Sequence, residues 1–327
     1  MAVNTDFKKI YDVIIVGGGP AGYTAGLYAA RAGLASLLFA GASTVSQITV
    51  TDLIENYPGL PDGINGFELM ERFRQQAVKF GLEVAAADVE KLEKLTDGGK
   101  TLWMVKAGDI AGHARSVIMA TGAYWRKLGV PGEEDFAGRG VSYCATCDGP
   151  FYRNREVVVV GGGNTAVQEA IFLTHFAAKV TIIHRRNRFR AAGILAQRAL
   201  ANPKIQAVWN SVVEEIGGEK GVEWIRIKDV RNGAMQQIPA AGVFIFVGLI
   251  PQTDLVRDLA AREKDGAIIV DREMRTSAPG LFACGDCIDK SLRQVVTACG
   301  DGATAAFAAE QYIEELRGTA YSAWSPH

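Results

Sequence analysis

Short hydrophobic runs that end in glycine recur along this chain, and their spacing predicts a parallel β-sheet. Residues 11–16 form the first run, a glycine-rich stretch covers residues 17–22, and a helical run extends from there to about Ala32. A second hydrophobic run follows at residues 36–39. Runs without polar alternation are typical of strands that are buried on both faces. The pattern therefore predicts a unit of strand, glycine turn, helix and strand.

The same unit recurs later in the chain. Residues 156–160 are hydrophobic, a glycine-rich turn covers residues 161–166, a helical run reaches about Ala177, and residues 179–183 form the next hydrophobic run. A GxGxxG-type turn is a weak signal alone, but between a buried strand and a helix it is a strong one for dinucleotide binding. The sequence thus predicts an α/β protein with two Rossmann-like dinucleotide-binding domains.

Each predicted unit closes with a hydrophobic strand that runs into glycine, at residues 117–122 and 243–248. A further run at residues 280–286 comes after both units, and we expect it to return and complete the first sheet. The predicted domains are then a discontinuous first domain, residues 1–122 with 251–327, and an inserted second domain, residues 123–250, each with its own dinucleotide site.

Composition narrows the class of function. The chain has 327 residues, a formal net charge of −1, 48% hydrophobic residues and 22% charged residues, which is typical of a soluble globular protein with two domains. A near-zero net charge argues against a protein that binds nucleic acids or membrane surfaces. No apolar run approaches the ~20 residues that span a bilayer. The N-terminal residues lack a signal-peptide pattern, so we expect a cytoplasmic location.

The two glycine turns have a defined chemical use. The first glycine permits a tight turn, the second lets the backbone approach a pyrophosphate, and the third position lets helix and strand pack closely. The pyrophosphate then lies at the helix N-terminus, where unpaired N–H groups and the helix dipole favour an anion. A glycine turn without a ligand is the alternative, and two copies in the same context argue against it. The positions are Gly17, Gly19 and Gly22 in the first copy, and Gly161, Gly163 and Ala166 in the second.

The tip of the second strand in each unit discriminates between dinucleotides. An acidic residue there binds a free ribose 2′-hydroxyl, whereas arginine accommodates a 2′-phosphate. Residues 184–190 contain four arginines and no acid, which predicts NADP over NAD in the second unit; a solvated basic surface is the alternative. Residues 39–41 carry neither type, so by elimination FAD fits the first unit. A flavin is also the cofactor that links a nicotinamide to a disulfide.

The sequence Cys144-Ala145-Thr146-Cys147-Asp148 carries the candidate redox chemistry. Two thiols at this spacing can close a small disulfide and reopen it, and such thiols commonly have a lowered pKa. Asp148 offers a carboxyl group that can move the proton which the exchange requires. Half of a zinc site, or two small buried residues, are the alternatives.

The other cysteines have a different context. Cys284 and Cys287 form a second CxxC, and Cys299 follows. A four-cysteine zinc site is one possibility, but the two pairs lie far apart in the sequence. Asp286 falls just after a strand that should reach the first cofactor. We interpret these three cysteines as small residues around a flavin site in which Asp286 binds ribityl hydroxyls; redox-active or metal-binding thiols are the alternative. His175 is expected to be a packing or surface residue.

Together these motifs resemble those of the low-molecular-weight, bacterial-type thioredoxin reductases, nearly from end to end. The resemblance covers residues 17–22, 55–59, 120–122, 144–148, 161–166, 184–190, 285–286 and 293–297. It implies a homodimeric flavoenzyme that uses FAD and NADPH to reduce the disulfide of thioredoxin. Cys144 and Cys147 would form its redox pair, and Asp148 would be its acid/base group.

The motifs and the resemblance also predict the residues of each cofactor site. FAD is expected to contact Gly17, Gly19, Pro20, Ala21, Gly22, Gln47, Asn56, Thr121, Gly122, Asp286, Arg293, Gln294 and Val295. NADPH is expected to contact Gly161, Gly163, Asn164, Thr165, Ala166, His184, Arg185, Arg186 and Arg190. No metal ligand is predicted.

The chain departs from the usual pattern of that family at several positions. Val45-Ser46 precedes Gln47 where Gly-Gly is usual, Leu292 stands in place of an aromatic residue, and Asn164-Thr165 stands where Asp-Ser is common.

Two other functions stay open at this point. One is an enzyme resembling ferredoxin/flavodoxin–NADP reductases or H2O2-forming flavin oxidases, against which the CxxC argues because those reactions need no dithiol. The other is a flavin-binding redox sensor.

Overall fold

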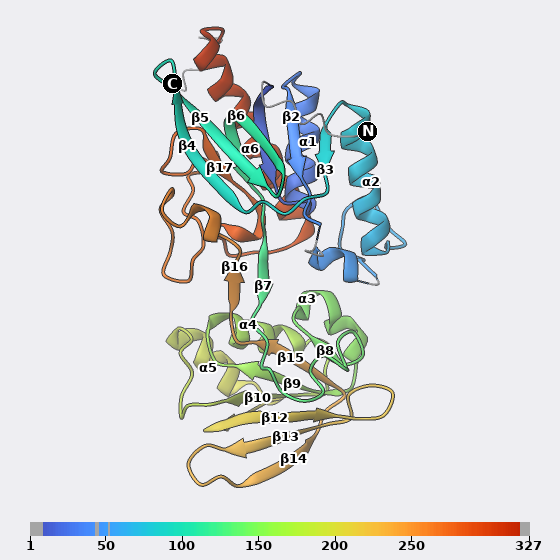
Figure 1. Ribbon diagram of the computed structural model, residues 1–327. Helices are drawn as coiled ribbons and strands as arrows, with labels where there is room; N and C mark the ends of the chain where they lie inside the picture. Colours follow the sequence, from blue (N-terminus) through green and yellow to red (C-terminus); the bar gives the residue numbers. More distant parts are fainter. Residues whose placement is uncertain (1–8, 43–45, 52, 321–327) are drawn as a thin grey trace. The chain divides into compact units, whose positions relative to one another are not determined.

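The structure is a computed structural model, and it describes residues 9–42, 46–51 and 53–320 of the chain (Figure 1). Val45, one of the positions that departs from the family pattern, lies outside the described residues. The chain folds into two compact units, unit 1 and unit 2, which are described separately below.

The chain crosses between the two units twice. Unit 1 runs up to Tyr124 and resumes at Ile250, and unit 2 consists of Trp125–Leu249. The crossings are made by β7 (Ala123–Trp125) and β16 (Leu249–Pro251), which pair with each other. Unit 1 is therefore discontinuous in sequence, and unit 2 is a continuous insertion.

The sheet of unit 1 consists of β1 (Ile10–Val16), β2 (Ser36–Phe39), β3 (Glu83–Ala85), β4 (Lys91–Asp97), β5 (Lys100–Ala107), β6 (Ile110–Met119) and β17 (Leu281–Ala283). Its parallel part has the order β3-β2-β1-β6, and β4 and β5 extend it in the antiparallel direction. Val16 pairs with both Phe39 and Met119, and Ala283 also pairs with Met119. These strands thus end at one edge of the sheet. The parallel pairing of β17 with β6 confirms that residues 280–286 return to the first sheet.

The helices of unit 1 are α1 (Pro20–Arg31), η1 (Gln47–Val50), α2 (Gly66–Lys79), η3 (Asp254–Val256), η4 (Gly285–Cys287) and α6 (Val295–Arg317). The side-chain oxygen of Asn65 caps α2 by accepting hydrogen bonds from the N–H groups of Phe67 and Glu68, which satisfies two of its unpaired donors. Helices α1 and α6 pack closely against each other. Gly302 permits this contact, because a Cβ there would overlap the carbonyl oxygen of Ala21.

The parallel sheet of unit 2 consists of β8 (Val141–Ser142), β9 (Glu156–Gly161), β10 (Lys179–His184), β11 (Ile205–Trp209) and β15 (Gly242–Phe246). Its order is β11-β10-β9-β15-β8. An antiparallel sheet follows in sequence, with β12 (Ser211–Gly217), β13 (Trp224–Asp229) and β14 (Met235–Pro239). The helices are α3 (Ala145–Asp148), η2 (Gly149–Tyr152), α4 (Asn164–Leu173) and α5 (Gly193–Ala201). The predicted α/β class with two Rossmann-like sheets is confirmed.

One predicted helix is shorter than expected. The hydrophobic pattern extended it to about Ala177, but α4 ends at Leu173. The next residues form turns, in which the N–H of Phe176 donates to the carbonyl oxygen of Leu173 at 3.0 Å. The N–H of Ala178 then donates to the carbonyl oxygen of Arg155 at 2.9 Å. The chain leaves the helix early because it must turn back to enter β10.

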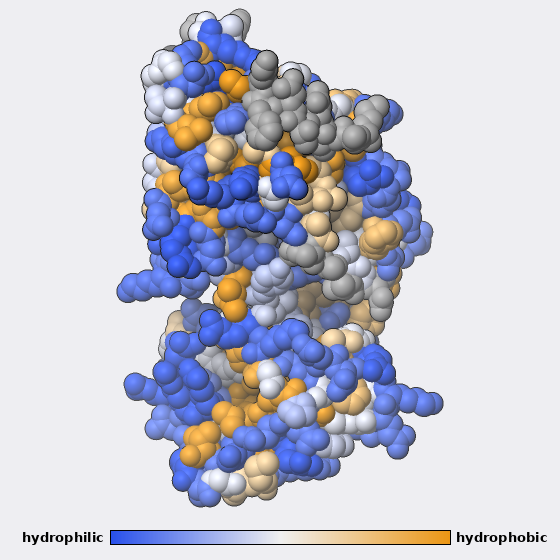
Figure 2. Space-filling model, viewed as in Figure 1, coloured by the Kyte–Doolittle hydropathy of each residue, from blue (hydrophilic) through white to orange (hydrophobic). Residues whose placement is uncertain are grey.

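The surface is mixed in character. On the face shown in Figure 2, hydrophilic residues predominate, and hydrophobic residues lie in small groups among them. Within the described ranges, none of the helices combines the length and the apolar character that a membrane-spanning segment needs.

Candidate active site

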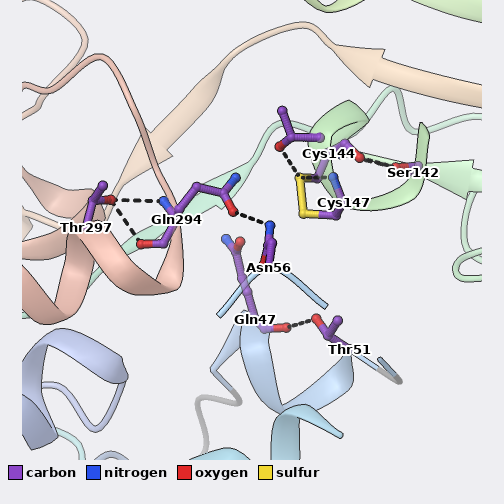
Figure 3. Close-up of a disulfide and its surroundings, with 9 residues drawn as sticks. Gln47, Thr51, Asn56, Ser142, Cys144, Cys147, Gln294 and Thr297 are labelled. Carbon is purple, nitrogen blue, oxygen red and sulfur yellow. Dashed lines mark hydrogen bonds between the residues drawn. A yellow bond between two sulfur atoms is a disulfide. The ribbon is translucent and has the colours of Figure 1, made fainter. Parts of the chain in front are cut away.

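Unit 2 holds Cys144 and Cys147 in a disulfide bond, with their Cα atoms 5.3 Å apart (Figure 3). Cys144 follows β8 and caps α3, which contains Cys147. Ala145 between them is fully buried and packs in the core of unit 2, so α3 is anchored to this unit. The two sulfurs are therefore held at disulfide distance by a short helix, which fits a redox-active pair.

Two groups surround the sulfur of Cys144. The N–H of Cys147 donates to Cys144 Sγ at 3.2 Å, and the hydroxyl oxygen of Thr146 lies 3.3 Å from the same sulfur. Both groups can donate a hydrogen bond to a thiolate, and such bonds favour the charged form. When the disulfide is reduced, Cys144 is therefore the sulfur whose thiolate this local structure stabilises.

Asp148 ends α3 directly after Cys147. Burial raises the pKa of its carboxyl group above the usual value, and a hydrogen bond from Ser142 lowers that pKa in part. A carboxyl group with a raised pKa keeps its proton to higher pH than a free aspartate does. Asp148 can thus hold a proton next to the redox pair, as an acid/base group requires.

The second glycine turn joins β9 to α4. Gly161 has a φ of 150°, and a Cβ there would lie 2.6 Å from the Cβ of Ala166. Gly163 caps α4 without a side-chain hydrogen bond, which leaves the first N–H groups of the helix to an anion. Asn164 accepts a 2.8 Å hydrogen bond from the N–H of Ala192 and ties the start of α4 to the segment after β10. Thr165 is exposed in the same turn.

The arginine-rich turn follows β10. Arg185, Arg186 and Arg190 are all exposed. The N–H of Arg190 donates to the carbonyl oxygen of Gly162 at 2.7 Å, and its guanidinium Nη2 lies 3.8 Å from the place that a Cβ on Gly163 would take. The arginines therefore lie next to the glycine turn in one unit. A planar guanidinium matches a phosphate group, so this turn fits a dinucleotide that carries a 2′-phosphate.

His184 lies beneath this turn. It is only 6% exposed, and a Cβ on Gly162 would overlap its ring. Burial lowers the pKa of His184 most, and the charges of Arg190, Arg186 and Arg185 lower it further. The ring is therefore neutral at physiological pH, and it supports the glycine turn by packing.

The first glycine turn joins β1 to α1. Gly17 has a φ of 118°, and a Cβ there would overlap the carbonyl oxygen of Ala120. A Cβ on Gly22 would likewise overlap the carbonyl oxygen of Gly17. Around Gly19, by contrast, the nearest described atom to a Cβ is Ser46 Oγ at 3.6 Å. The backbone at Gly19, at the start of α1, is thus open to a ligand.

Helix α1 begins at Pro20, and Ala21 behind it is buried. The Cβ of Ala21 would lie 2.9 Å from a Cβ on Gly285. The first glycine turn and the loop that carries Asp286 are therefore in contact, although they are far apart in the sequence.

Asp286 is the best evidence for a polar ligand in unit 1. Its Oδ1 atom is buried and has no hydrogen-bond partner among the described residues. Burial is also the largest cause of its raised pKa. A buried carboxylate oxygen needs a donor, and a ligand hydroxyl supplies one. The residues around it fit the ribityl chain of a flavin.

Two other side chains fix the loop that holds Asp286. Asp301 of α6 accepts a 3.2 Å hydrogen bond from the N–H of Gly285 and pairs with Lys290. The guanidinium of Arg293 donates to the carbonyl oxygens of Lys290 and Ile288, at 3.0 and 3.2 Å. The described contacts of Arg293 thus hold the loop in place.

The remaining predicted flavin residues lie in the same unit. Gln294 caps α6 through Thr297, and its Oε1 accepts a 3.0 Å hydrogen bond from Asn56 (Figure 3). Val295 is the first residue of α6. Gln47 donates through its side chain to the carbonyl oxygen of Ala123. Thr121 donates to the carbonyl oxygen of Gln252, and Gly122 next to it has a φ of 70°.

Comparison with known proteins decides the family. Residues 11–302 match the model described as pyridine nucleotide-disulphide oxidoreductase. The chain belongs to the pyridine nucleotide-disulphide oxidoreductase family. Among its members, the thioredoxin reductase of Listeria monocytogenes serovar 1/2a is 48% identical over 311 residues, which are 95% of this chain and 96% of that one. The bifunctional thioredoxin reductase/thioredoxin of Mycobacterium leprae is 43% identical over 313 residues, which are 95% of this chain and 68% of that one.

Solved structures of the pyridine nucleotide-disulphide oxidoreductase family agree. The crystal structure of thioredoxin reductase from Streptococcus pyogenes MGAS5005 superimposes with a TM-score of 0.86 at 46% identity, and the match covers 94% of this chain and 99% of that one. The resemblance predicted from the motifs is thus confirmed. Membership of this family implies a flavin and a nicotinamide cofactor, and the two glycine turns and the buried Asp286 oxygen fit such groups.

Cys284, Cys287 and Cys299 lie far from the redox pair in the sequence, and they are free thiols. Cys284 and Cys287 are fully buried and Cys299 is half-buried. Burial is the largest cause that raises the pKa of each, so the thiols stay protonated. Within the part of the chain that the structure describes, no group of three or more His, Cys, Asp or Glu side chains could hold a metal. His175 is exposed.

Sequence reasoning missed several residues that shape these sites. Ser142 gave no signal, because a single serine before a CxxC has no diagnostic pattern. Its hydroxyl accepts a hydrogen bond from the N–H of Cys144 and lowers the pKa of Asp148. Asp301 was missed because its partner, the N–H of Gly285, lies on a different element. Trp209 packs 6.4 Å from His184, centroid to centroid, and only the parallel neighbour β11 brings it there.

Proposed function

We propose that this chain is a thioredoxin-disulfide reductase that takes electrons from NADPH and binds FAD. The observation that carries the proposal is the Cys144–Cys147 disulfide, which shares unit 2 with a glycine turn and its three neighbouring arginines. The reductase relatives support it, and in the Mycobacterium leprae relative the name joins the reductase to thioredoxin. The reaction takes a hydride from NADPH and a proton from solvent, and it converts the thioredoxin disulfide into two thiols.

The residues of this chain account for the exchange step. A flavin bound in unit 1 would relay electron pairs between the nicotinamide and the disulfide. In the reduced protein, the Cys144 thiolate attacks one sulfur of the thioredoxin disulfide, a mixed disulfide forms, and the other thioredoxin sulfur leaves and takes a proton. Cys147 then attacks Cys144, which restores the Cys144–Cys147 bond and releases the second thioredoxin thiol.

The direct test is the oxidation of NADPH by the purified protein in the presence of oxidised thioredoxin. We expect NADPH consumption that is stoichiometric with new thioredoxin thiols, and no consumption with alkylated, disulfide-free thioredoxin. An NADPH oxidation rate that depends on oxygen and not on thioredoxin would contradict the proposal and support a flavin oxidase. The disulfide and the reductase relatives do not favour that alternative or a redox sensor.

Asp148→Asn is expected to lower kcat for thioredoxin by roughly 10²–10⁴-fold, the usual contribution of a positioned acid or base. Since burial raises the pKa of Asp148, its acid form persists to higher pH than in a free aspartate. The wild-type rate should therefore fall as pH rises through that pKa, and the variant should lack this limb. A pH profile of kcat measures both effects. If the pH profile of kcat in Asp148→Asn is the same as that of the wild type, Asp148 does not act as the acid.

Asp286→Ala is expected to weaken flavin binding. A hydrogen bond to a charged group is worth about 1.5–3 kcal/mol, so the dissociation constant should rise roughly 10–100-fold. The ratio of flavin to protein absorbance in the purified variant measures this loss. Asp289→Ala is the matched control, because Asp289 is exposed three residues further along the same loop and should retain the flavin. Equal flavin content in both variants would contradict the assignment.

The proposal extends to assembly and location. The resemblance predicts a homodimer, which sedimentation of the purified protein tests directly. A cytoplasmic location stays a prediction from the sequence, and fractionation of the source cells tests it.

A further inference from the structure

One carboxylate oxygen of α6 closes the loop that holds Asp286. The Oδ2 atom of Asp301 accepts a 3.2 Å hydrogen bond from the N–H of Gly285, and the same atom pairs with the Nζ of Lys290. Gly285 directly precedes Asp286, and Lys290 lies four residues after it. The two contacts therefore hold both ends of the segment around Asp286 against α6.

The ion pair of this loop is largely shielded from water. The side chains of Lys290 and Asp301 are 12% and 16% exposed. Removal of one partner from such a pair leaves an uncompensated buried charge, which is strongly unfavourable. Asp301 is also a second acid beside Asp286, in a unit that is expected to accept an anionic dinucleotide. Lys290 offsets the charge of Asp301 at this place.

The same part of α6 also contacts the first glycine turn. Gly302 follows Asp301, and a Cβ on Gly302 would lie 2.3 Å from the carbonyl oxygen of Ala21, near the start of α1. A Cβ on Gly285 would lie 2.9 Å from the Cβ of Ala21. Helix α6, the Asp286 loop and the glycine turn thus meet at Ala21. Since there is no free space between them, the hydrogen bond to Gly285 fixes the loop in one place.

We propose that Asp301 is a positioning residue of the flavin site, whose oxygen on the N–H of Gly285 holds Asp286 in place, and that Lys290 is its counter-charge. This inference rests on the proposed binding of FAD in unit 1. It assigns two separate roles to the pair. The hydrogen-bond acceptor is required for flavin binding, whereas the two charges are required only because each neutralises the other.

Two double variants separate these roles. Lys290→Met/Asp301→Asn removes both charges and keeps a side-chain oxygen for the N–H of Gly285. Lys290→Met/Asp301→Leu removes both charges and that oxygen, so the two variants have the same net charge and differ in the acceptor. Asp301→Asn alone leaves Lys290 without its counter-charge. Glu315→Gln is the matched control, because it removes an acid from an exposed position on the same helix.

The measurement is the dissociation constant of FAD. Each whole protein is purified with excess FAD and diluted in steps, and free and bound flavin are separated by ultrafiltration and quantified by absorbance. We expect Lys290→Met/Asp301→Asn and Glu315→Gln to stay close to the wild type. In Lys290→Met/Asp301→Leu and in Asp301→Asn alone, the dissociation constant should rise roughly 10–100-fold, because a buried donor or charge lacks its partner when the loop is in place.

Hydrogen exchange supplies a second readout that needs no flavin. In the flavin-free proteins, the peptide that contains Gly285 should exchange faster in Lys290→Met/Asp301→Leu than in Lys290→Met/Asp301→Asn, because its N–H has lost the acceptor. A role in stability alone would lower the melting temperature of the flavin-free protein without a change in the FAD dissociation constant. If Lys290→Met/Asp301→Leu does not fold, Asp301→Ala takes the place of Asp301→Leu and removes the same oxygens with a smaller side chain.

The outcomes distinguish this inference from the proposed function. Equal FAD dissociation constants in the two double variants, or a wild-type value in Asp301→Asn alone, would overturn the roles given to Asp301 and Lys290. A wild type that binds FAD but does not reduce thioredoxin would contradict the proposed function and leave the FAD comparison intact. A wild type that binds no FAD would overturn both.

Discussion

Replacement of either Cys144 or Cys147 with serine is expected to abolish the reduction of thioredoxin by this protein. A serine hydroxyl cannot form a disulfide, so the variant has no sulfur pair that can hold and release two electrons. Hydride transfer from NADPH to the bound flavin needs neither sulfur. Anaerobic addition of NADPH should therefore still bleach the flavin absorbance in both variants, while new thioredoxin thiols should be absent.

The two serine variants should differ in one respect. In Cys147→Ser, the remaining Cys144 thiolate keeps the hydroxyl of Thr146 and the N–H of residue 147 close to its sulfur. It can attack thioredoxin, but no second thiol resolves the product. We expect a stable mixed disulfide between Cys144 and thioredoxin in this variant, and much less of one in Cys144→Ser. Non-reducing electrophoresis measures the adduct.

An artificial electron acceptor, such as a quinone, provides the internal control. It accepts electrons from the flavin without a dithiol, so NADPH–quinone activity should survive in both serine variants. Full thioredoxin reduction in either single variant would exclude the redox role of the pair and restore the structural or zinc interpretation. Loss of the quinone activity as well would show that the substitution damaged the fold or the cofactor site.

The parallel strands were the most predictable part of the fold. Residues 36–39 were expected as a strand and form β2, and residues 179–183 lie within β10. These strands are buried on both faces, so their sequences are continuously hydrophobic. The antiparallel strands gave no comparable signal. β13, for example, alternates between buried and half-buried positions, and such short alternating segments resemble loops when the partner strand is unknown.

In the candidate sites too, features set by consecutive residues were predictable, and features set by contacts between distant segments were not. The glycine turns and the arginine turn were predictable, because their chemistry lies within a few consecutive residues. The residues that hold these turns in place were not predictable from the sequence, because they come from segments that are distant along the chain. The packing of His184 on Gly162 needs the register of β10, and the hydrogen bond from Asn56 to Gln294 joins two loops that only the fold of unit 1 brings together. Asp286 was predictable by type, whereas its unpaired buried oxygen required the structure.

Substitution of Arg185, Arg186 and Arg190 with glutamine should convert this protein from a strong preference for NADPH to little preference between NADPH and NADH. Each charge-assisted hydrogen bond to the 2′-phosphate is worth at most about 1.5–3 kcal/mol. Each single substitution should therefore raise KM for NADPH by at most roughly 10–100-fold. KM for NADH should change little, because NADH has no 2′-phosphate, and kcat at saturating NADPH should be maintained.

Two controls separate phosphate recognition from general damage to the turn. Arg188 is exposed in the same segment but is not among the residues predicted to contact NADPH, so Arg188→Gln should leave KM for NADPH nearly unchanged. In the triple variant the pKa of His184 should rise, because the three arginine charges that lower it are gone while the burial remains. NMR titration of the His184 ring reports whether the turn keeps its place. Efficient use of NADH by the wild type, or an equal loss of NADH and NADPH activity in the triple variant, would show that these arginines do not select the 2′-phosphate.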